Sequence, residues 1–399
     1  MSEKACPTPE PFHAVIGSII LLTFLFFLTF ISRFIFAPLM PAIGKDLGIS
    51  SGQAGSVFLM GSLGFFFASL FSGFIAAVIN HRGALILSIL GSGVALISCA
   101  LVHSLWAIQV VMLVLGIAAG LNLPSNMATI TAMVSRQDWG KALAVQQMAP
   151  PLSLVLGPLL SIALLRWFSW QVTLACLGFF SLAVGLYCIR FARFGDFPGS
   201  APGLANTKAI LSQRSFWIMV ILFALGMGGQ VGIYAMLPLY LVTERGMESG
   251  SANSLLGLSQ ISALFMTFVA GWVTDRLGEK PAIALFLSAS GVVTILLGIA
   301  SGTWLKVVVF VQPALIVCYF PAGFSALARI VQPNLRSLAT AVATPTAFVI
   351  GGGILPAALG YMGQAYTFGL GIALAGCMIL LGPTLVFALK LLDKMEDGC

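Results

Sequence analysis

The sequence predicts an all-α membrane protein in which twelve transmembrane helices form two bundles of six. Of its 399 residues, 59% are hydrophobic and only 8% are charged, whereas charged residues make up about 25% of an ordinary soluble domain. The apolar residues gather in runs long enough to cross a bilayer, which takes about 20 residues per helix. A polar segment near the middle of the chain separates six runs from six, and the two sets repeat weakly.

The first apolar run is the first predicted helix. It is too long for the core of a signal peptide, and no small-residue cleavage site follows it, so we expect it to remain in the membrane. Aromatic residues that prefer the headgroup zone mark the outer ends of several runs, and they are Trp106, Trp167, Trp170, Trp304 and Tyr366. The twelve predicted helices cover, in chain order, residues 13–38, 52–79, 84–102, 106–131, 142–165, 171–189, 215–241, 252–274, 281–300, 305–329, 337–361 and 367–389.

Lys and Arg residues are unevenly divided between the two ends of the predicted helices. Fourteen of the nineteen fall on the side that carries both termini, four fall on the other side (Lys45, Arg166, Arg245 and Lys306), and Arg33 lies within the membrane. By the positive-inside rule, both termini are predicted to be cytoplasmic, and the chain is predicted to be a multi-pass protein of the plasma (inner) membrane. The net charge of +7 then reflects topology and not binding to nucleic acid.

Residues 190–213 are the predicted cytoplasmic linker between two six-helix halves, residues 1–189 and 214–399. The linker contains FGDFPGSAPGLANTK, a mixture of Pro, Gly, Ala and Ser that neither packs nor forms a regular element.

Two segments of the first half recur in the second half. GFIAAVINHRGALI from Gly73 aligns with GWVTDRLGEKPAIA from Gly271, a shift of 198 positions. PSNMATITAMVSRQDWGKALAV from Pro124 aligns with PAGFSALARIVQPNLRSLATAV from Pro321, a shift of 197. Nearly equal shifts indicate an internal repeat. In a chain with many spans, such a repeat is typical of a transporter whose substrate site lies near the bilayer midplane, at the interface between the repeats.

The second copy of the first segment carries a loop signature. Gly271, Asp275, Arg276, Gly278 and Lys280 resemble the G-x-x-x-D-R-x-G-[RKE]-[RK] motif of the major facilitator superfamily, and the resemblance covers nearly the whole chain. It implies two six-helix bundles related by pseudo-two-fold symmetry. It also implies that Asp275 braces the cytoplasmic gate by facing the N-terminus of a neighbouring helix, where the dipole favours negative charge. The alternative is a basic turn without a gating role.

The first copy of the loop is degenerate. It keeps Gly73, His81 and Arg82 but has Ala77 where the motif has its acid, so it cannot provide the same brace. In the fourth predicted helix, Gly116 and Gly120 stand four residues apart. Small residues at this spacing let membrane helices approach closely, which favours a packing role for them.

Arg33 is the only charged residue well inside a predicted span, and none of the twelve Asp and Glu residues accompanies it there. A charge at membrane depth is costly, so a functional role is the default hypothesis, and its sign predicts an anionic substrate. The segment SRFIFAPLMPAIGKDLGISSGQAG resembles the first helix of the organic-anion symporter branch. That resemblance implies that Arg33 binds the substrate's acidic group, a carboxylate or a similar oxyanion, although Ser32 replaces the acid that precedes the arginine there.

The superfamily resemblance implies that helices 1, 4, 7 and 10 line the central cavity, and these helices supply further polar residues. The shift of 197 relates Arg33 to Gln230 and Asn122 to Tyr319, as a pseudo-symmetric site would require. The predicted substrate-binding residues are Arg33, Asn122, Asn126, Gln230, Tyr234 and Tyr319, and Thr29, Thr129 and Gln312 lie in the same helices.

Each candidate has an alternative role. Asn and Gln in membrane helices often hydrogen-bond between helices as structural links, and both tyrosines fit ordinary packing. Arg33 stands about twenty residues, or about 30 Å, from the start of helix 1. A short helix would therefore place it at the outer interface, where it could snorkel. Apolar residues continue to Met40, which favours a longer helix with Arg33 inside the membrane.

No predicted span contains a deep Asp, Glu or His, which argues against proton-coupled export of cationic drugs. Moving one charge across 100 mV is worth about 2.3 kcal/mol. Export, anion exchange or uptake together with a proton is therefore easier to reconcile with an anionic substrate than uncoupled uptake into a negative-inside cell.

The sequence thus predicts a secondary active or facilitative transporter that moves a small, carboxylate-type anion by alternating access. The alternative within the same fold is an exporter of neutral or amphipathic compounds. A non-transporting sensor or scaffold is disfavoured, because only the linker of about 24 residues could relay a signal. An enzyme is not expected, because the chain has no phosphate-binding loop, no His/Cys metal cluster and no embedded acid–base pair. We expect no cofactor or metal, and a monomer whose partners are the solute and the lipid bilayer.

Overall fold

The computed structural model describes residues 11–192, 194–199, 204–332, 335–389 and 391. Within them, eleven helical stretches are long and apolar enough to cross a membrane. One stretch, Ser51–Leu101, has 51 residues and bends at Asn80, so it provides two crossings. The all-helical, twelve-span fold that the sequence predicts is therefore confirmed.

Packing divides the chain into two compact units. The first unit comprises Met1–Ile49 and Met60–Ala201, and the second comprises Ser50–Leu59 and Pro202–Cys399. The boundary after Ala201 falls inside the predicted linker. Residues 50–59, which include the first turns of the third helix, pack with the second unit.

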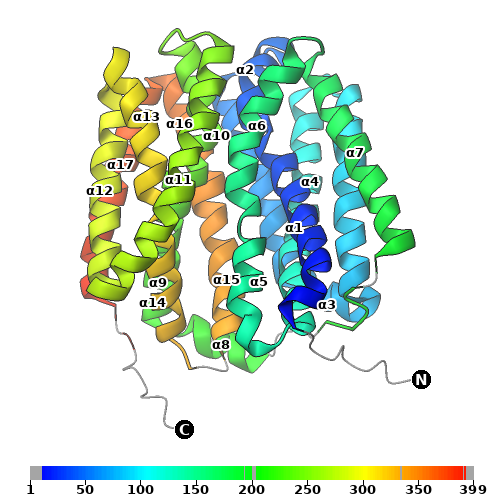
Figure 1. Cartoon of the computed structure of the whole chain (residues 1–399). Coiled ribbons are helices and arrows are strands. Elements are labelled where there is room, and N and C mark those ends of the chain that lie inside the picture. Colours follow the sequence, from blue (N-terminus) through cyan, green and yellow to red (C-terminus); the bar gives the residue numbers. More distant parts are fainter. Residues whose placement is uncertain (1–10, 193, 200–203, 333–334, 390, 392–399) are drawn as a thin grey trace. The chain divides into compact units, whose positions relative to one another are not determined.

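The first unit provides six crossings among its described residues (Figure 1). Two of these crossings consist of two consecutive helices each, and the long helix α3 contributes to two more. The helices are α1 (Phe12–Phe34), α2 (Phe36–Leu47), α3 (Ser51–Ser98), α4 (Leu105–Met133), α5 (Trp139–Gln146), α6 (Ala149–Leu165) and α7 (Trp170–Phe191).

The second unit also provides six crossings in the part that the structure describes. Two of them contain a short π-helical segment, which we call η3 and η5. The elements are α8 (Leu204–Leu211), α9 (Arg214–Met227), η3 (Gly228–Gly232), α10 (Ile233–Thr243), α11 (Ser249–Leu277), α12 (Glu279–Ile299), α13 (Gly302–Val317), α14 (Tyr319–Arg329), α15 (Arg336–Val349), η5 (Ile350–Ile354), α16 (Leu355–Ala365) and α17 (Phe368–Phe387).

Prolines explain where three of the crossings are interrupted. A proline has no N–H to bond the carbonyl four residues earlier, and its ring crowds that carbonyl. The helix α1 ends four residues before Pro38, α5 ends four residues before Pro150, and α13 ends four residues before Pro321. Each interruption is one or two residues long, so the chain continues in nearly the same direction as a second helix (Figure 1).

The internal repeat is visible in the backbone. Asn80 bends α3 with φ 62° and ψ 165°, and Gly278 separates α11 from α12 with φ 81° and ψ 169°. The two positions differ by the predicted shift of 198. Among the described non-glycine residues, Asn80 alone has a positive φ, and its φ and ψ together fall in a region that glycine occupies far more readily than other residues. The same sharp bend therefore occurs once in each half of the chain.

Glycines allow the backbones of α3 and α4 to approach each other closely where the two helices cross. A Cβ at Gly116 would overlap the carbonyl oxygen of Gly61, and a Cβ at Gly64 would overlap that of Leu113. At Gly120 a Cβ would lie 2.6 Å from the carbonyl oxygen of Phe65. The packing role predicted for Gly116 and Gly120 is confirmed, because only glycine leaves room for the facing backbone.

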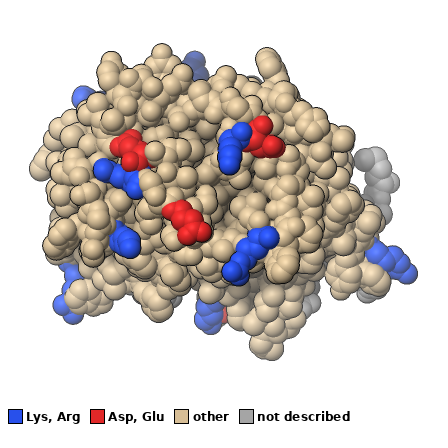
Figure 2. Space-filling view, turned by 90° about the horizontal axis from the view of Figure 1, so that it is seen from above, with Lys and Arg blue, Asp and Glu red and all other residues tan. Residues whose placement is uncertain are grey.

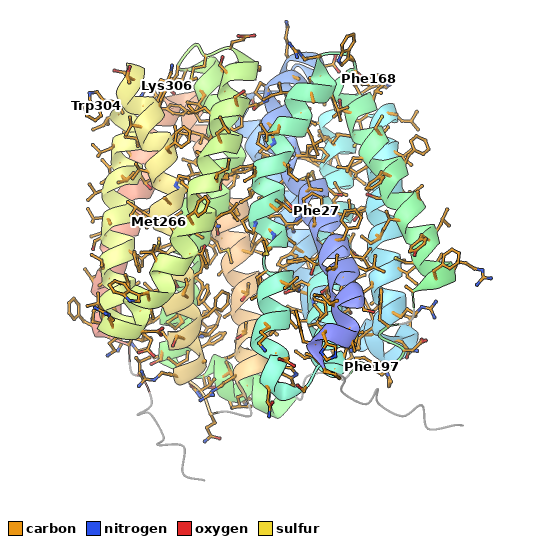
Figure 3. The ribbon with its side chains drawn as sticks, in the orientation of Figure 1. Phe27, Phe168, Phe197, Met266, Trp304 and Lys306 are labelled. Carbon is orange, nitrogen blue, oxygen red and sulfur yellow. The ribbon has the colours of Figure 1, made fainter. Side chains whose placement is uncertain are left out.

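Aromatic and charged residues mark the helix ends. Trp304 and Lys306 lie at one end of the second unit, where α13 begins (Figure 3), and the Trp304 side chain is 75% exposed. Charged side chains are sparse on the face at the top of Figure 1, and uncharged residues cover most of it (Figure 2). Trp170 differs from the predicted headgroup anchors, because it is only 3% exposed and its indole N–H donates to Asp46 Oδ2 at 2.9 Å.

We predict that Gly116→Ala lowers the thermal stability of the purified protein, because the added methyl group must push α3 and α4 apart. Overpacking of this kind costs about 1–3 kcal/mol. Gly91→Ala is the matched control, since Gly91 lies in α3, the partner helix of α4, and a Cβ there meets nothing within 4 Å. Thermal unfolding followed by intrinsic fluorescence measures both variants. Equal melting temperatures would contradict the proposed role of the glycines.

Candidate substrate-binding site

Arg33 lies well inside the first crossing. The continuous span Phe12–Leu47 extends fourteen residues past Arg33, which is about 21 Å of helix. The longer first helix that the apolar run to Met40 predicts is therefore present, and it ends only where Gly48 adopts φ 63°. The Arg33 side chain is 4% exposed, so it is buried within the protein and does not reach a solvent-exposed helix end.

Two phenyl rings flank the Arg33 guanidinium. Its central carbon lies 4.8 Å from the ring centroid of Phe65 and 5.3 Å from that of Phe34. A cation over an aromatic face is attracted by the ring quadrupole. Phe34 follows Arg33 directly, whereas Phe65 comes from α3. Phe65 is the first of three consecutive phenylalanines, and no sequence signal identifies it as the contact of Arg33.

The glycine crossing of α3 and α4 holds Phe65 in place. Added Cβ atoms at Gly116 and Gly120 would lie 2.9 Å from Phe65 N and 2.6 Å from Phe65 O. The backbone of Phe65 therefore sits directly against α4, and its ring extends to Arg33 on α1. The contact between α3 and α4 thus positions the ring that packs against the guanidinium on α1.

Asn122 is a buried amide that no other described residue satisfies. Its side chain is 0% exposed, and neither Oδ1 nor Nδ2 makes a hydrogen bond. Leaving a buried polar group without a partner costs about 1–3 kcal/mol, so such a group in a membrane protein points to a ligand or a bound water. Ser125 Oγ, in the next turn of α4, is in the same situation.

Asn126 has a different environment. Its Nδ2 donates to the carbonyl oxygen of Leu22 on α1 at 2.7 Å, and its Oδ1 accepts from Gln146 Nε2 on α5 at 3.4 Å. Asn126 therefore links three helices. This is the structural role that Asn and Gln often have in membrane helices. Gln146 was not identified from the sequence, because no local sequence pattern indicates that its side-chain amide points toward α4.

In the second unit, the candidates lie around the π-helical segment η3. Gln230 is inside η3, Tyr234 is in the first turn of α10, and Tyr319 begins α14. The Tyr319 side chain is fully buried, and its hydroxyl has no hydrogen-bond partner among the described residues. Its ring fits against two glycines, because Cβ atoms at Gly226 and Gly323 would lie 2.6 and 2.9 Å from it.

Gln312 supports η3 from α13. Its Nε2 donates to the carbonyl oxygen of Gly229 at 2.8 Å, and it lies 3.5 Å from Thr294 Oγ1 on α12. The segment η3 also packs directly on η5, since a Cβ at Gly232 would overlap the carbonyl oxygen of Gly351. Single-turn π segments are rare and often occur at functional sites. Gln230 thus stands on a backbone segment whose shape is fixed by neighbouring helices.

The loop signature lies at the junction of α11 and α12. Gly278 supplies the positive φ, Arg276 stacks over Trp272 at 4.3 Å, and Asp275 is exposed and makes no side-chain hydrogen bond within the described part of the chain. Glu279 also belongs to the signature but was not among the predicted site residues. Its carboxylate pairs with Arg329 at 2.7 Å and accepts a hydrogen bond from Ser325 at 3.0 Å. The gating roles of Gly271, Asp275, Arg276, Gly278 and Lys280 stay predictions.

Known proteins match this chain over most of its length. The family model of the Major Facilitator Superfamily matches residues 22–356. Membrane sensor protein UhpC of Salmonella typhimurium is 23% identical over 278 residues, which are 63% of this chain and 62% of UhpC. A gallate transporter of Pseudomonas putida is 22% identical over 296 residues, which are 65% of this chain and 66% of that protein. Both alignments span slightly less than two thirds of the relatives' own length.

A solved structure shares the fold over nearly the whole chain. The bacterial homolog of the human lysosomal transporter Spinster, in an inward-facing and occupied conformation, superposes with a TM-score of 0.79. The superposition covers 96% of this chain and 97% of that one at 15% sequence identity, so it shows the fold alone. With the family model, the loop signature and the repeated bend in agreement, the chain belongs to the Major Facilitator Superfamily, whose members include membrane transporters.

Proposed function

We propose that this membrane transporter moves a small anionic solute with a carboxylate-type group, and that Arg33 binds that group. The observation that carries the proposal is a buried guanidinium packed on the Phe65 ring, in the same unit as a fully buried amide, Asn122, that has no hydrogen-bond partner among the described residues. The position of Arg33, fourteen residues before the end of its span, supports a role inside the membrane.

The chemistry of this pair suits an oxyanion. A guanidinium is planar, and its fork of N–H groups matches the two oxygens of a carboxylate. Contact with a phenyl face contributes about 0.5–2 kcal/mol, whereas charge-assisted hydrogen bonds to an ion contribute about 1.5–3 kcal/mol each. An anion would therefore add more favourable energy at Arg33 than the aromatic contact does.

Asn122 can complement Arg33, because an amide offers two N–H donors and one carbonyl acceptor. In the second unit, the Tyr319 hydroxyl is a further buried polar group without a partner in the described structure, at the position that the repeat relates to Asn122. Asn126 is a weaker candidate, since its amide already links α1, α4 and α5. We propose Arg33 and Asn122 as the principal binding residues of the first unit. In the second unit, we propose Tyr319 as the principal binding residue and Gln230 and Tyr234 as supporting ones.

The relative named a gallate transporter supports a carboxylate as the transported group. We propose that transport proceeds by alternating access in the plasma membrane, with both chain ends in the cytoplasm. Because one charge across 100 mV is worth about 2.3 kcal/mol, export, anion exchange or uptake with a proton fits an anion best. The relative named a membrane sensor favours a second candidate, a sensor that binds the same anion without moving it.

We predict that Arg33→Gln weakens anion binding at least tenfold, because it removes charge-assisted hydrogen bonds worth about 1.5–3 kcal/mol. Thermal-shift titration of the purified protein with gallate, benzoate and nitrate measures binding, and uptake of the best anion into proteoliposomes measures transport. Arg33→Lys keeps the charge without the planar fork, so we expect an intermediate effect.

Equal anion binding by wild type and Arg33→Gln would contradict the binding role of Arg33. Anion binding without any flux in proteoliposomes would instead favour the sensor function.

We predict opposite effects for two neighbouring asparagines. Asn122→Leu removes an amide that makes no hydrogen bond in the described structure, so the unliganded melting temperature should stay the same or rise. Anion affinity should fall about tenfold or more, as expected for one lost hydrogen bond to an ion, worth about 1.5–3 kcal/mol. Asn126→Leu removes two links between helices and should lower the melting temperature. Thermal shift with and without the anion measures both effects, and a large loss of stability in Asn122→Leu would show that its role is structural.

A further inference from the structure

Six residues that follow α7, residues 194–199, lie across the bend of α3, and we call them the strap. Three backbone hydrogen bonds join the strap to the bend. Arg82 N donates to Gly195 O at 2.9 Å, His81 N donates to Phe197 O at 3.2 Å, and Gly199 N donates to Ala76 O at 3.0 Å. A bend leaves N–H groups after it and carbonyls before it without helical partners. The strap provides partners for groups of both kinds.

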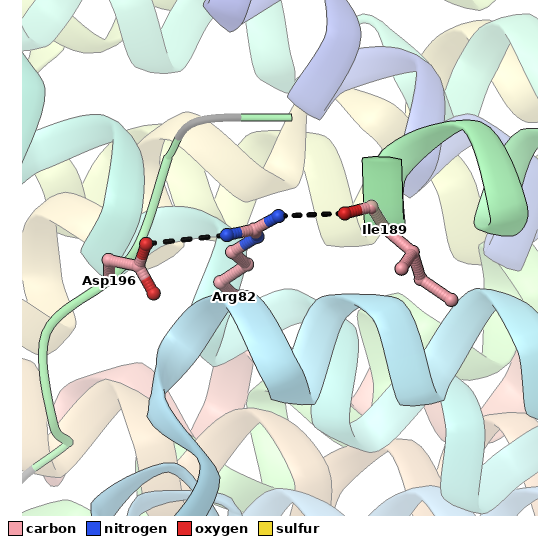
Figure 4. A network of polar contacts seen from close by, with 3 residues as sticks. All are labelled: Arg82, Ile189 and Asp196. Carbon is pink, nitrogen blue, oxygen red and sulfur yellow. Dashed lines mark hydrogen bonds and ion pairs between the residues drawn. The ribbon is translucent and has the colours of Figure 1, made fainter. Parts of the chain in front are cut away.

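Side chains strengthen the contact. Arg82 Nη1 lies 3.4 Å from Asp196 Oδ2, and Arg82 Nη2 donates to the carbonyl oxygen of Ile189 at 2.9 Å (Figure 4). One arginine therefore connects the bend, the strap and the last turns of α7. The His81 ring also lies 4.8 Å from the Phe197 ring, and the strap residue Phe194 is buried in the hydrophobic core of the first unit.

Glycines allow the strap to lie this close. Gly195 has φ +70°, and a Cβ there would lie 3.0 Å from Arg82 N. A Cβ at Gly199 would lie 2.6 Å from the Cβ of Ala76 and 3.0 Å from the carbonyl oxygen of Gly73. Gly73 and Arg82 are two of the residues that the degenerate loop retains. In this structure, both face the strap.

The two repeats brace the same bend in different ways. After Gly278, Glu279 pairs with Arg329 on α14 within the second unit. After Asn80, the corresponding residue is His81, and the segment from Ala76 to Arg82 contains no carboxylate. Asp196 brings a carboxylate to this bend from outside the repeat.

We propose that Asp196 is a positioning residue that supplies the carboxylate that the α3 bend lacks at His81, the counterpart of Glu279, and that the strap fixes the α3 bend to the end of α7. The strap, the bend and the last turns of α7 then move as one piece during transport. This inference does not depend on which solute is carried. It makes residues 194–199 part of the first bundle and not a passive connection.

Hydrogen–deuterium exchange of the full-length protein in lipid nanodiscs tests the strap directly, because the amides of His81 and Arg82 donate to strap carbonyls. Loss of one partly exposed ion pair is a small effect, so Asp196→Asn should speed exchange at these amides about two- to fivefold. Gly199→Val, which cannot lie on Ala76, should speed it at least tenfold, as expected when a local contact opens. Asp196→Glu should restore the wild-type rate.

One further variant serves as the control. Glu248→Gln is the matched control, since Glu248 is exposed and makes no side-chain hydrogen bond or ion pair among the described residues. Unchanged exchange in both Asp196→Asn and Gly199→Val, relative to Glu248→Gln, would overturn the strap. Failure of Asp196→Glu to keep the wild-type rate would overturn the role of Asp196.

Discussion

Within the hydrocarbon core, every backbone N–H and C=O must find a partner inside the protein. The first consequence is twelve helical crossings, and the second appears wherever a helix is imperfect. Pro124 cannot bond the carbonyl oxygen of Gly120, and Ser69 Oγ from α3 donates to that oxygen at 3.4 Å. In the π-helical segment η3, the carbonyl oxygen of Gly229 accepts from Gln312. Polar side chains on neighbouring helices thus satisfy backbone groups where a helix departs from regular geometry.

This requirement also separates structural polar residues from candidate binding residues. Asn126, Gln146 and Gln312 resemble substrate ligands when they are considered one at a time, but each is engaged between helices. Asn122 and Tyr319 differ, because their polar atoms make no hydrogen bond within the described structure although both side chains are fully buried. Their relation by the repeat gives them equivalent places in the two halves. The proposal that they bind solute therefore depends on their unmet hydrogen-bonding capacity and not on polarity alone.

The internal repeat preserves a backbone shape more faithfully than the residues that stabilise it. Asn80 and Gly278 have nearly the same φ and ψ, but Glu279 braces one bend through Arg329, whereas the strap covers the other through Asp196 and three backbone hydrogen bonds. A bend can be held by any carboxylate or carbonyl that reaches it, so its partners can come from different parts of the chain. The connection between the halves has taken part of this role in the first half.

The sequence by itself determined the number of crossings and the twofold repeat, and it favoured a packing role for Gly116 and Gly120 and a position inside the membrane for Arg33, because hydropathy, spacing and helix length are local properties. The tertiary structure decided which polar atoms are satisfied. No local pattern indicates that Phe65 lies under Arg33, that Trp170 turns inward to Asp46, or that Asp196 reaches Arg82 across 114 positions of the chain. Each of these contacts joins helices or loops distant in sequence, and the packing of the whole unit brings them together.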